Sequence, residues 1–183
     1  MKIEILSSNR FAKMEQFLER LTRFPASLVL MFVLIFGLYF PTISYDYSNF
    51  HDDVVIESKM SELKDWSNAG NILLGNVPAL PELSQTYRPM MTLSFMADAT
   101  IGGGSLISFR ITNLIIQALI GFFLFRLFLQ LEYNRVLSLL ISIATVVNPF
   151  MLHAFLWLPA RGDLLLVLFG LLSIISFIRF SES

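Results

Sequence analysis

The chain has no cysteine and little charge: Asp, Glu, Lys and Arg make up 15% of its 183 residues. The absence of cysteine excludes disulfides, thiolate nucleophiles and cysteine-ligated metals. The few charges nearly cancel, to a formal net charge of −1, so no basic surface for nucleic acid is predicted. By contrast, 55% of the residues are hydrophobic, and a membrane protein is therefore predicted.

The hydrophobic residues fall in four long blocks, at about 25–43, 107–131, 136–158 and 164–180. The first block contains no charged residue, and as a helix of roughly 28 Å it approaches the thickness of a bilayer core. Short connections at 132–135 and 159–163 separate the later blocks. We therefore predict an all-α polytopic membrane protein with four transmembrane helices and a large non-cytoplasmic first loop, 44–106.

The fourth block is short, because its uncharged part runs only from Leu164 to Ile178. The turn from Arg161 to Asp163 is therefore expected to dip into the membrane. Polar side chains at membrane depth face protein or a wet cavity. Several near the predicted outer ends of the blocks favour an outward-facing polar pocket: Arg110, Asn113, Gln117, Asn148, His153, Arg161 and Asp163.

Basic residues predict the orientation of the chain. Residues 1–24 form a predicted cytoplasmic, amphipathic interfacial helix, and 25–180 form a single membrane domain. With both termini in the cytoplasm, the inner side holds more of the Lys and Arg than the outer side, as the positive-inside bias requires. The inner residues are Lys2, Arg10, Lys13, Arg20, Arg23, Arg126, Arg135 and Arg179.

The predicted outer loop contains one short interfacial helix. Apolar and charged residues alternate over about 54–66, and Asp52 or Asp53 stands at the position of its N-cap. The rest of the loop, with Pro78, Pro81 and the glycines at 102–104, is predicted to be irregular.

Asp52 and Asp53 are the first candidates for chemistry. Two adjacent carboxylates in a partly desolvated site raise one another's pKa, which suits a general base. The alternative is a helix cap in a solvated acidic loop. His51 stands beside them, but consecutive residues do not converge easily on one ion, and no metal site or cofactor is predicted.

The remaining polar candidates each have two interpretations. Arg88, in Tyr87-Arg88-Pro89, is suited to grip a phosphate or to pair with a loop acid. Arg161 and Asp163 flank a glycine and either hold a charged headgroup or pair with each other. Asn113 and Gln117 lie four residues apart, and they either line a pocket or join helices by hydrogen bonds.

Taken together, these pieces resemble the N-terminal part of the GT-C membrane glycosyltransferases, in particular the protein O-mannosyltransferase-like group that often carries TPR repeats. The matching segments, in order, are Phe50-His51-Asp52-Asp53, Tyr87-Arg88-Pro89-Met90, Phe109-Arg110-Ile111-Thr112-Asn113, and Asn148-Pro149 through Trp157 to Arg161-Gly162-Asp163.

The resemblance implies an enzyme that uses a polyprenyl-phosphate sugar at the outer membrane face. It implies that Asp52, with Asp53 beside it, is the catalytic base. Arg88 and Arg161 would hold the donor phosphate, and Asp163 and Asn113 would support the cavity, with Tyr87 adjoining Arg88. His153 stands where the family usually has glutamate, so one acceptor or acid/base contact is expected to differ.

We therefore expect a GT-C-like glycosyltransferase module that transfers a sugar from a polyprenyl-phosphate donor to a hydroxyl of a protein or glycan. The family's members are several times longer, so we expect a truncated enzyme complemented by a downstream-encoded membrane segment. The alternative is a non-catalytic membrane subunit or fragment that binds lipid headgroups or a partner protein. The expected location is the bacterial inner (plasma) membrane, with the first loop outside.

Overall fold

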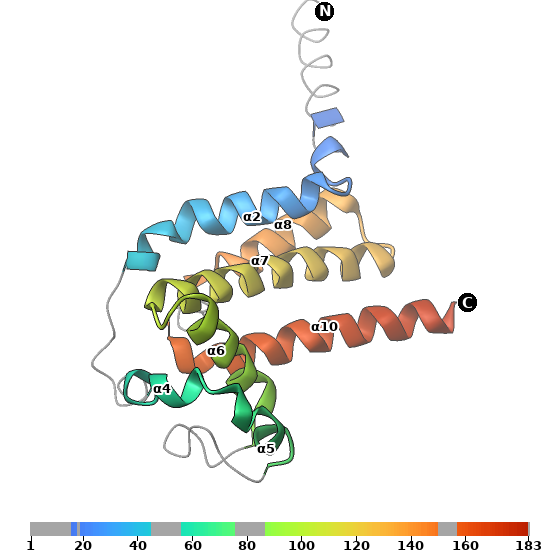
Figure 1. Ribbon diagram of the computed structural model, residues 1–183. Coiled ribbons are helices and arrows are strands. Elements are labelled where there is room, and N and C mark those ends of the chain that lie inside the picture. The colour runs from blue at the N-terminus through green and yellow to red at the C-terminus, as the bar shows by residue number, and fades with distance from the viewer. Residues whose placement is uncertain (1–15, 18, 45–55, 76–86, 150–156, 183) are drawn as a thin grey trace, which may run out of the picture.

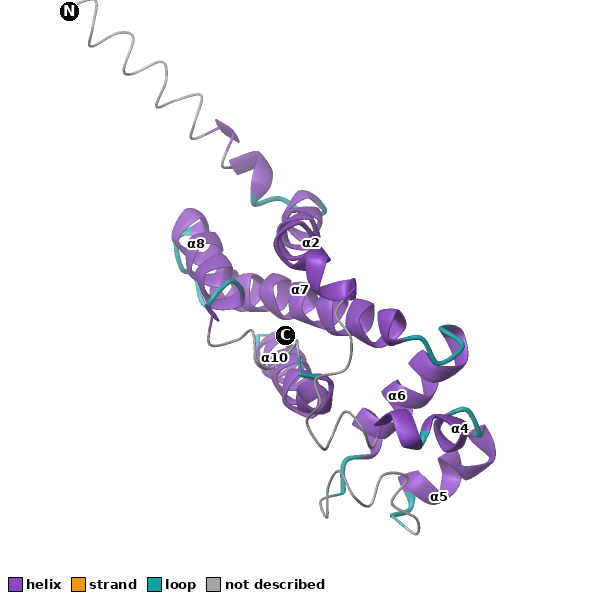
Figure 2. Cartoon of the chain, turned by 90° about the vertical axis from the view of Figure 1, so that its left-hand side faces the viewer, coloured by secondary structure: helices purple, strands orange, loops and turns teal. Residues whose placement is uncertain are grey.

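The computed structural model of the chain describes residues 16–17, 19–44, 56–75, 87–149 and 157–182 (Figure 1). These residues form helices and connecting loops, with no strand among them (Figure 2). Three helical segments are long and apolar enough to cross a membrane: Ala26–Ser44, Leu106–Gln130 and Leu158–Ser181. The described residues are thus all-helical, as predicted, and their three long apolar segments support an integral membrane protein. Two of these segments match predicted spans to within one residue, and the third contains the fourth predicted span.

The longest helix, α7 (Leu106–Gln130), is the centre of the structure. It has 25 residues and is about 37 Å long at 1.5 Å per residue. Three other helices pack against it: α2 (Ala26–Tyr39), α8 (Arg135–Val146) and α10 (Arg161–Ser181). Its buried residues lie along its whole length, because neighbours cover it on several sides.

The four helices run alternately in direction (Figure 1). We call the end at which α2 finishes and α7 and α10 begin the loop end, and the opposite end the terminal end. Beyond α2, the 3-10 turn η1 (Phe40–Ser44) continues to the loop end. At the terminal end, the turn from α7 to α8 is closed by Asn134, whose side chain accepts a hydrogen bond of 3.0 Å from the Val136 N–H.

The third predicted span, 136–158, is not a continuous helix in the described residues. Helix α8 has 12 residues, about 18 Å, and a turn follows at Val147. Asn148 and Pro149 come next, and proline disfavours a helical residue before it. Residues 150–156 lie outside the described part, so the described residues contain three candidate spans and one half-length apolar helix.

The end of α8 is satisfied by side chains from two neighbouring helices. Val146 is the last residue of α8, so its carbonyl has no partner within that helix. The Gln117 side-chain amide of α7 donates to this carbonyl at 3.1 Å. The Tyr39 hydroxyl of α2 donates to the next carbonyl, that of Val147, at 3.4 Å. A polar helix end is thereby accommodated inside an apolar bundle.

The helical segment at the fourth predicted span is longer than the prediction. The 3-10 turn η3 (Leu158–Ala160) leads directly into α10, and together they form a helical segment of 24 residues, Leu158–Ser181. The predicted connection at 159–163 is therefore helical and no turn is needed to dip inward. The helix begins earlier than the charge pattern indicated because Arg161 is fully buried and paired.

The predicted outer loop is more helical than expected. Residues 56–58 and α4 (Met60–Leu63) are helical, which confirms the described part of the short helix, while its predicted N-cap lies outside the described residues. The 3-10 turn η2 (Trp66–Asn68) and α5 (Ala69–Leu73) follow. The prediction of an irregular chain up to residue 106 is wrong, because α6 (Pro89–Ile101) is a helix that starts with proline at its first position.

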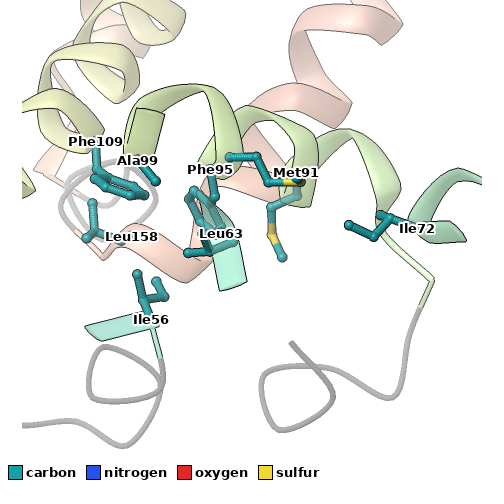
Figure 3. Close-up of a cluster of buried hydrophobic side chains, with 9 residues drawn as sticks. Ile56, Leu63, Ile72, Met91, Phe95, Ala99, Phe109 and Leu158 are labelled. Atoms are coloured by element: carbon teal, nitrogen blue, oxygen red, sulfur yellow. The ribbon is translucent and has the colours of Figure 1, made fainter. Parts of the chain in front are cut away.

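Helix α6 forms because one of its faces is buried at helical spacing. Its buried residues are Met91, Thr92, Phe95, Met96, Asp98 and Ala99, a pattern with the period of an α-helix. The apolar members share a core with α4, α5, and the first residues of α7 and η3 (Figure 3). This core fastens the helices of the first loop to the loop end of the bundle.

The predicted amphipathic helix at 1–24 lies mostly outside the described residues. Residues 16–17 and 19–21 are helical, and the chain then turns at residues 22–25 into α2. The rest of that prediction is untested.

Candidate site at the loop end

The loop end brings the start of α6 against the start of α10. Arg88 immediately precedes α6 and is exposed. Its side chain lies over Gly162 in the first turn of α10: a Cβ atom at Gly162 would stand 3.3 Å from Arg88 Nη1 and 3.5 Å from Arg88 Cδ. Contacts at 3.3 Å are tighter than ordinary, so the glycine gives the guanidinium room to lie on the helix start.

Arg161, the residue before Gly162, is fully buried. Its Nε donates to Asn113 Oδ1 at 2.6 Å, and its Nη2 donates to the Phe109 carbonyl at 2.7 Å. Its Nη1 donates to Asp98 Oδ2 at 2.5 Å and to Ser94 Oγ at 3.3 Å. One guanidinium thus joins α6, α7 and α10.

Asp98 is the counter-charge of this group. The residue is 6% exposed, and its second carboxylate oxygen accepts a hydrogen bond of 2.6 Å from the Thr112 hydroxyl. The guanidinium carbon of Arg161 also lies 4.5 Å from the ring centre of Phe95 and 5.7 Å from that of Phe109. A buried charge needs such pairing and hydrogen bonding, and both are present here.

These contacts decide between the interpretations of Arg161 and Asp163. The two residues do not pair with each other: Arg161 pairs with Asp98, and Asp163 is exposed in the first turn of α10. In this structure the Arg161 guanidinium is occupied by protein acceptors, and it is shielded from solvent. The resemblance implies that Arg88 and Arg161 hold the donor phosphate, and of these two arginines only Arg88 is exposed.

Asn113 and Gln117 both join helices. Asn113 accepts from Arg161 of α10, and Gln117 donates to the end of α8. Both side chains are buried in α7. Of the two interpretations for these amides, hydrogen bonding between helices is the one that the structure bears out.

Tyr87 is held in place next to Arg88. Its ring is exposed, and its hydroxyl donates a hydrogen bond to the Leu73 carbonyl at the end of α5. Its ring also lies close to Gly75, where a Cβ would stand 3.6 Å from Tyr87 Cε2. Tyr87 thus ties the chain before α6 to α5 and fixes the direction from which Arg88 approaches.

The remaining predicted site residues, Asp52, Asp53 and His153, lie outside the described residues, as does His51. Their predicted roles are therefore untested. The described part of the site consists of Arg88, Gly162 and Asp163 at the surface, with Asn113, Asp98 and Arg161 beneath them.

Asp98 is the residue that the sequence analysis missed. It was not among the predicted site residues. A signal existed: Asp98 is the single charged residue between Pro89 and Ile101, and a lone carboxylate in such an apolar stretch needs a partner. Without the recognition that 89–101 is a helix packed on α10, nothing indicated Arg161 as that partner.

The surface of this site combines one exposed cation with one exposed anion. Arg88 offers a planar guanidinium suited to bidentate contact with a phosphate. Asp163 lies on the first turn of α10, where a carboxylate is favoured by the helix dipole, and it can accept hydrogen bonds from hydroxyl groups. The pair is therefore suited to an anionic group that carries a polyhydroxylated substituent.

Comparison of the chain with protein-family models, with curated proteins and with solved structures finds no match.

Proposed function

We propose that the chain is a GT-C-like glycosyltransferase module that transfers a sugar from a polyprenyl-phosphate donor to a hydroxyl of a protein or glycan. The observation that carries the proposal is the meeting of three separate motifs at the loop end. Arg88, from Tyr87-Arg88-Pro89-Met90, lies on Gly162 of Arg161-Gly162-Asp163. Asn113, from the segment that starts at Phe109, accepts a hydrogen bond from Arg161 beside that glycine. These are three of the four segments on which the resemblance depends.

The loop end faces the non-cytoplasmic side in this proposal, and the membrane is the bacterial inner membrane. The arginines at the terminal end, Arg126, Arg135 and Arg179, support this orientation through the positive-inside bias. A single cysteine at Met90 tests it, because the chain has no other cysteine and Met90 is exposed. Labelling of intact cells by a membrane-impermeant maleimide is expected; labelling only after lysis would reverse the orientation.

Arg88 steadies the phosphate of the donor, and Asp163 contacts hydroxyl groups of the sugar. Arg161 takes another role than the one the resemblance implies: it holds the start of α10 and does not touch the donor. An exposed guanidinium next to the developing negative charge stabilises a departing phosphate. The hydrocarbon tail of such a donor lies in the lipid beside the helices.

Transfer proceeds by direct displacement at the anomeric carbon. Asp52, with Asp53 beside it, takes the proton of the acceptor hydroxyl. The acceptor oxygen forms its bond to the anomeric carbon as the bond from that carbon to the phosphate oxygen breaks. The polyprenyl phosphate leaves with the electron pair, and its added negative charge is met by Arg88.

The test is sugar transfer from a radiolabelled polyprenyl-phosphate sugar in membranes that contain this chain. Asp52→Asn is expected to lower the rate by about 100-fold or more, as the loss of a general base does. Arg88→Ala should lower it as well, and Arg88→Lys should lower it less because the charge is kept. The matched control is Arg135→Ala, an exposed arginine at the terminal end. Full activity in both Asp52→Asn and Arg88→Ala would refute the assignment.

A second candidate is a non-catalytic membrane subunit that binds lipid headgroups or a partner protein. The observation that favours it is the exposure of two apolar helical segments, Ala26–Ser44 and Leu158–Ser181. In each of them, only 17% of an 18-residue apolar stretch is buried against the rest of the chain. Such faces are covered in a membrane by lipid or by further helices. Correct insertion and donor binding without transfer would favour this candidate.

A further inference from the structure

We propose that Asp98 is a positioning residue, which acts through Arg161 to hold the start of α10 under Arg88. The placement of the helices follows from contacts within the described residues. Its consequence for sugar transfer rests on the proposed function. Asp98 itself does not touch a substrate in this proposal.

The contacts form a short path from Asp98 to Arg88. Asp98 Oδ2 accepts from Arg161 Nη1 at 2.5 Å. Arg161 is followed in the chain by Gly162, against which the Arg88 side chain lies. Arg88 precedes α6 and Asp98 stands near the end of α6. The ion pair and the contact of Arg88 with Gly162 therefore hold the start of α10 against two separate places on α6. A small rotation of α10 would carry Gly162 away from Arg88.

Directional bonds are the reason for assigning this role to the ion pair and not to the apolar core alone. The core that joins α4–α6 to the loop end contains flexible side chains such as Met91 and Met96, which adapt to shifted neighbours. The Arg161 guanidinium is planar, and its three nitrogens each have a separate acceptor in α6 or α7. Such a fork fixes the rotation of α10 as well as its distance.

The carboxylate is itself fixed in direction. Thr112 of α7 donates to Asp98 Oδ1 at 2.6 Å, so the two oxygens of Asp98 are directed to different helices. Ser108 Oγ donates to the Asp98 carbonyl at 3.1 Å, which holds the backbone at the same place. Asp98 therefore sets α10 relative to both α6 and α7.

The experiment measures the distance between spin labels on Met90 and Leu166. Both residues are exposed, both lie near the starts of their helices, and no native cysteine interferes. The decisive variant is the pair Asp98→Leu with Arg161→Met, which removes both charges and leaves neither one buried alone. We expect a monodisperse, inserted protein whose distance distribution is broader than that of the parent. A distribution as narrow as the parent's would overturn the proposal.

A second variant decides the question if the pair variant does not fold. Thr112→Val removes one hydroxyl donor to Asp98 and leaves the ion pair in place. Broadening of the same distance would support the proposal, and an unchanged distribution would overturn it. The control is Ser142→Ala on α8, because the Ser142 hydroxyl is buried but donates only within its own helix, to Ser138. Its distribution should match the parent's.

Kinetics separate this proposal from the proposed function. In the pair variant, the KM for the polyprenyl-phosphate sugar should rise and kcat should fall, because a misplaced Arg88 neither contacts the phosphate of the bound donor nor meets its added charge as it leaves. A lower rate of transfer by the pair variant with no change in KM would count against the positioning role of Asp98. A broadened distance in a chain whose parent shows no transfer would leave the positioning role supported and the glycosyltransferase proposal refuted.

Discussion

The Arg161 guanidinium is a charge taken out of solvent and surrounded by partners from two other helices. Its neighbours are a carboxylate, an amide oxygen, a hydroxyl, a backbone carbonyl and two aromatic rings. Removing water from such a charge is expensive, and the pairing compensates for it only when the geometry is complete. Arg161 and Asp98 therefore depend on each other more than on any other single contact.

This dependence predicts how stability responds to substitution. Asp98→Leu leaves the Arg161 charge buried without its partner and is expected to lower the free energy of unfolding by about 3–5 kcal/mol. Asp98→Leu combined with Arg161→Met should lower it much less, because two apolar side chains of similar volume replace the pair. Unfolding by SDS in mixed micelles measures Asp98→Leu, Arg161→Met and the double variant. Additive losses in the double variant would show that the two residues are not coupled.

The sequence predicted part of this residue-level arrangement. Arg88, Asn113, Arg161 and Asp163 were identified as candidates, and the structure brings all four to the loop end. Their pairing was not predictable, because Arg161 has acids nearer in sequence than Asp98. Asp98 becomes the partner of Arg161 only because α6 packs against the start of α10.

At the scale of elements, α8 is the shortest of the four helices α2, α7, α8 and α10. It ends near the middle of α7, at the level where Gln117 reaches the Val146 carbonyl. Gly121, one turn further along α7, lets α8 approach closely: a Cβ there would stand 3.0 Å from Val146 Cγ1 and 3.1 Å from Met31 Sδ. The end of α8 is thus fitted between α2 and α7.

The cap supplied by Gln117 has a measurable effect. Gln117→Leu leaves a helix-end carbonyl without its donor inside the bundle and is expected to lower the free energy of unfolding by about 0.6–1.7 kcal/mol, the range of hydrogen bonds between membrane helices. The matched control is Gln130→Leu. Gln130 also donates to a backbone carbonyl, that of Ile175 at 3.4 Å, but Ile175 lies inside α10, where its carbonyl accepts a helical bond as well. An equal loss in both variants would contradict the capping role.

At this scale, the helices that the sequence predicted best are those with long uncharged hydrophobic runs. The spans at 25–43 and 107–131 were predicted within one residue of the helical segments, because uncharged runs of that length leave few alternatives. The start of α10 and the whole of α6 were not predicted. At 159–163 the charges of Arg161 and Asp163 indicated a connection, and the region of α6 was assigned to an irregular loop because of Pro78, Pro81 and the glycines at 102–104. The buried charges of Arg161 and Asp98 neutralise each other only in the folded chain. The end of α8 at Val146, within the predicted span 136–158, was not predicted either.

At the scale of the molecule, the chain is a set of membrane helices around α7 with a small helical layer attached at one end (Figures 1 and 2). The layer of α4, α5 and α6 shares its core with the first residues of α7 and with η3. The segments of the resemblance that the structure describes are gathered where this layer meets the bundle.

The overall class was predictable from composition, since a chain with few charges in long apolar blocks has few alternatives to a membrane bundle. The position of the site was only partly predictable. The order of the motifs indicated one side of the membrane, but their meeting depends on α6 folding back along α10. That contact joins residues more than 70 positions apart, Arg88 and Gly162, and no local pattern encodes it.

The most direct test of the account is the binding of a polyprenyl phosphate to the purified chain in nanodiscs, compared with the polyprenol that lacks the phosphate. We predict that the parent prefers the phosphate and that Arg88→Ala weakens its binding by roughly tenfold or more, as expected for a lost charge-assisted hydrogen bond. Arg135→Ala, at the terminal end, should bind like the parent. Equal binding by Arg88→Ala and the parent, or equal binding of the phosphate and the free alcohol, would contradict the assignment of the loop end as a donor site.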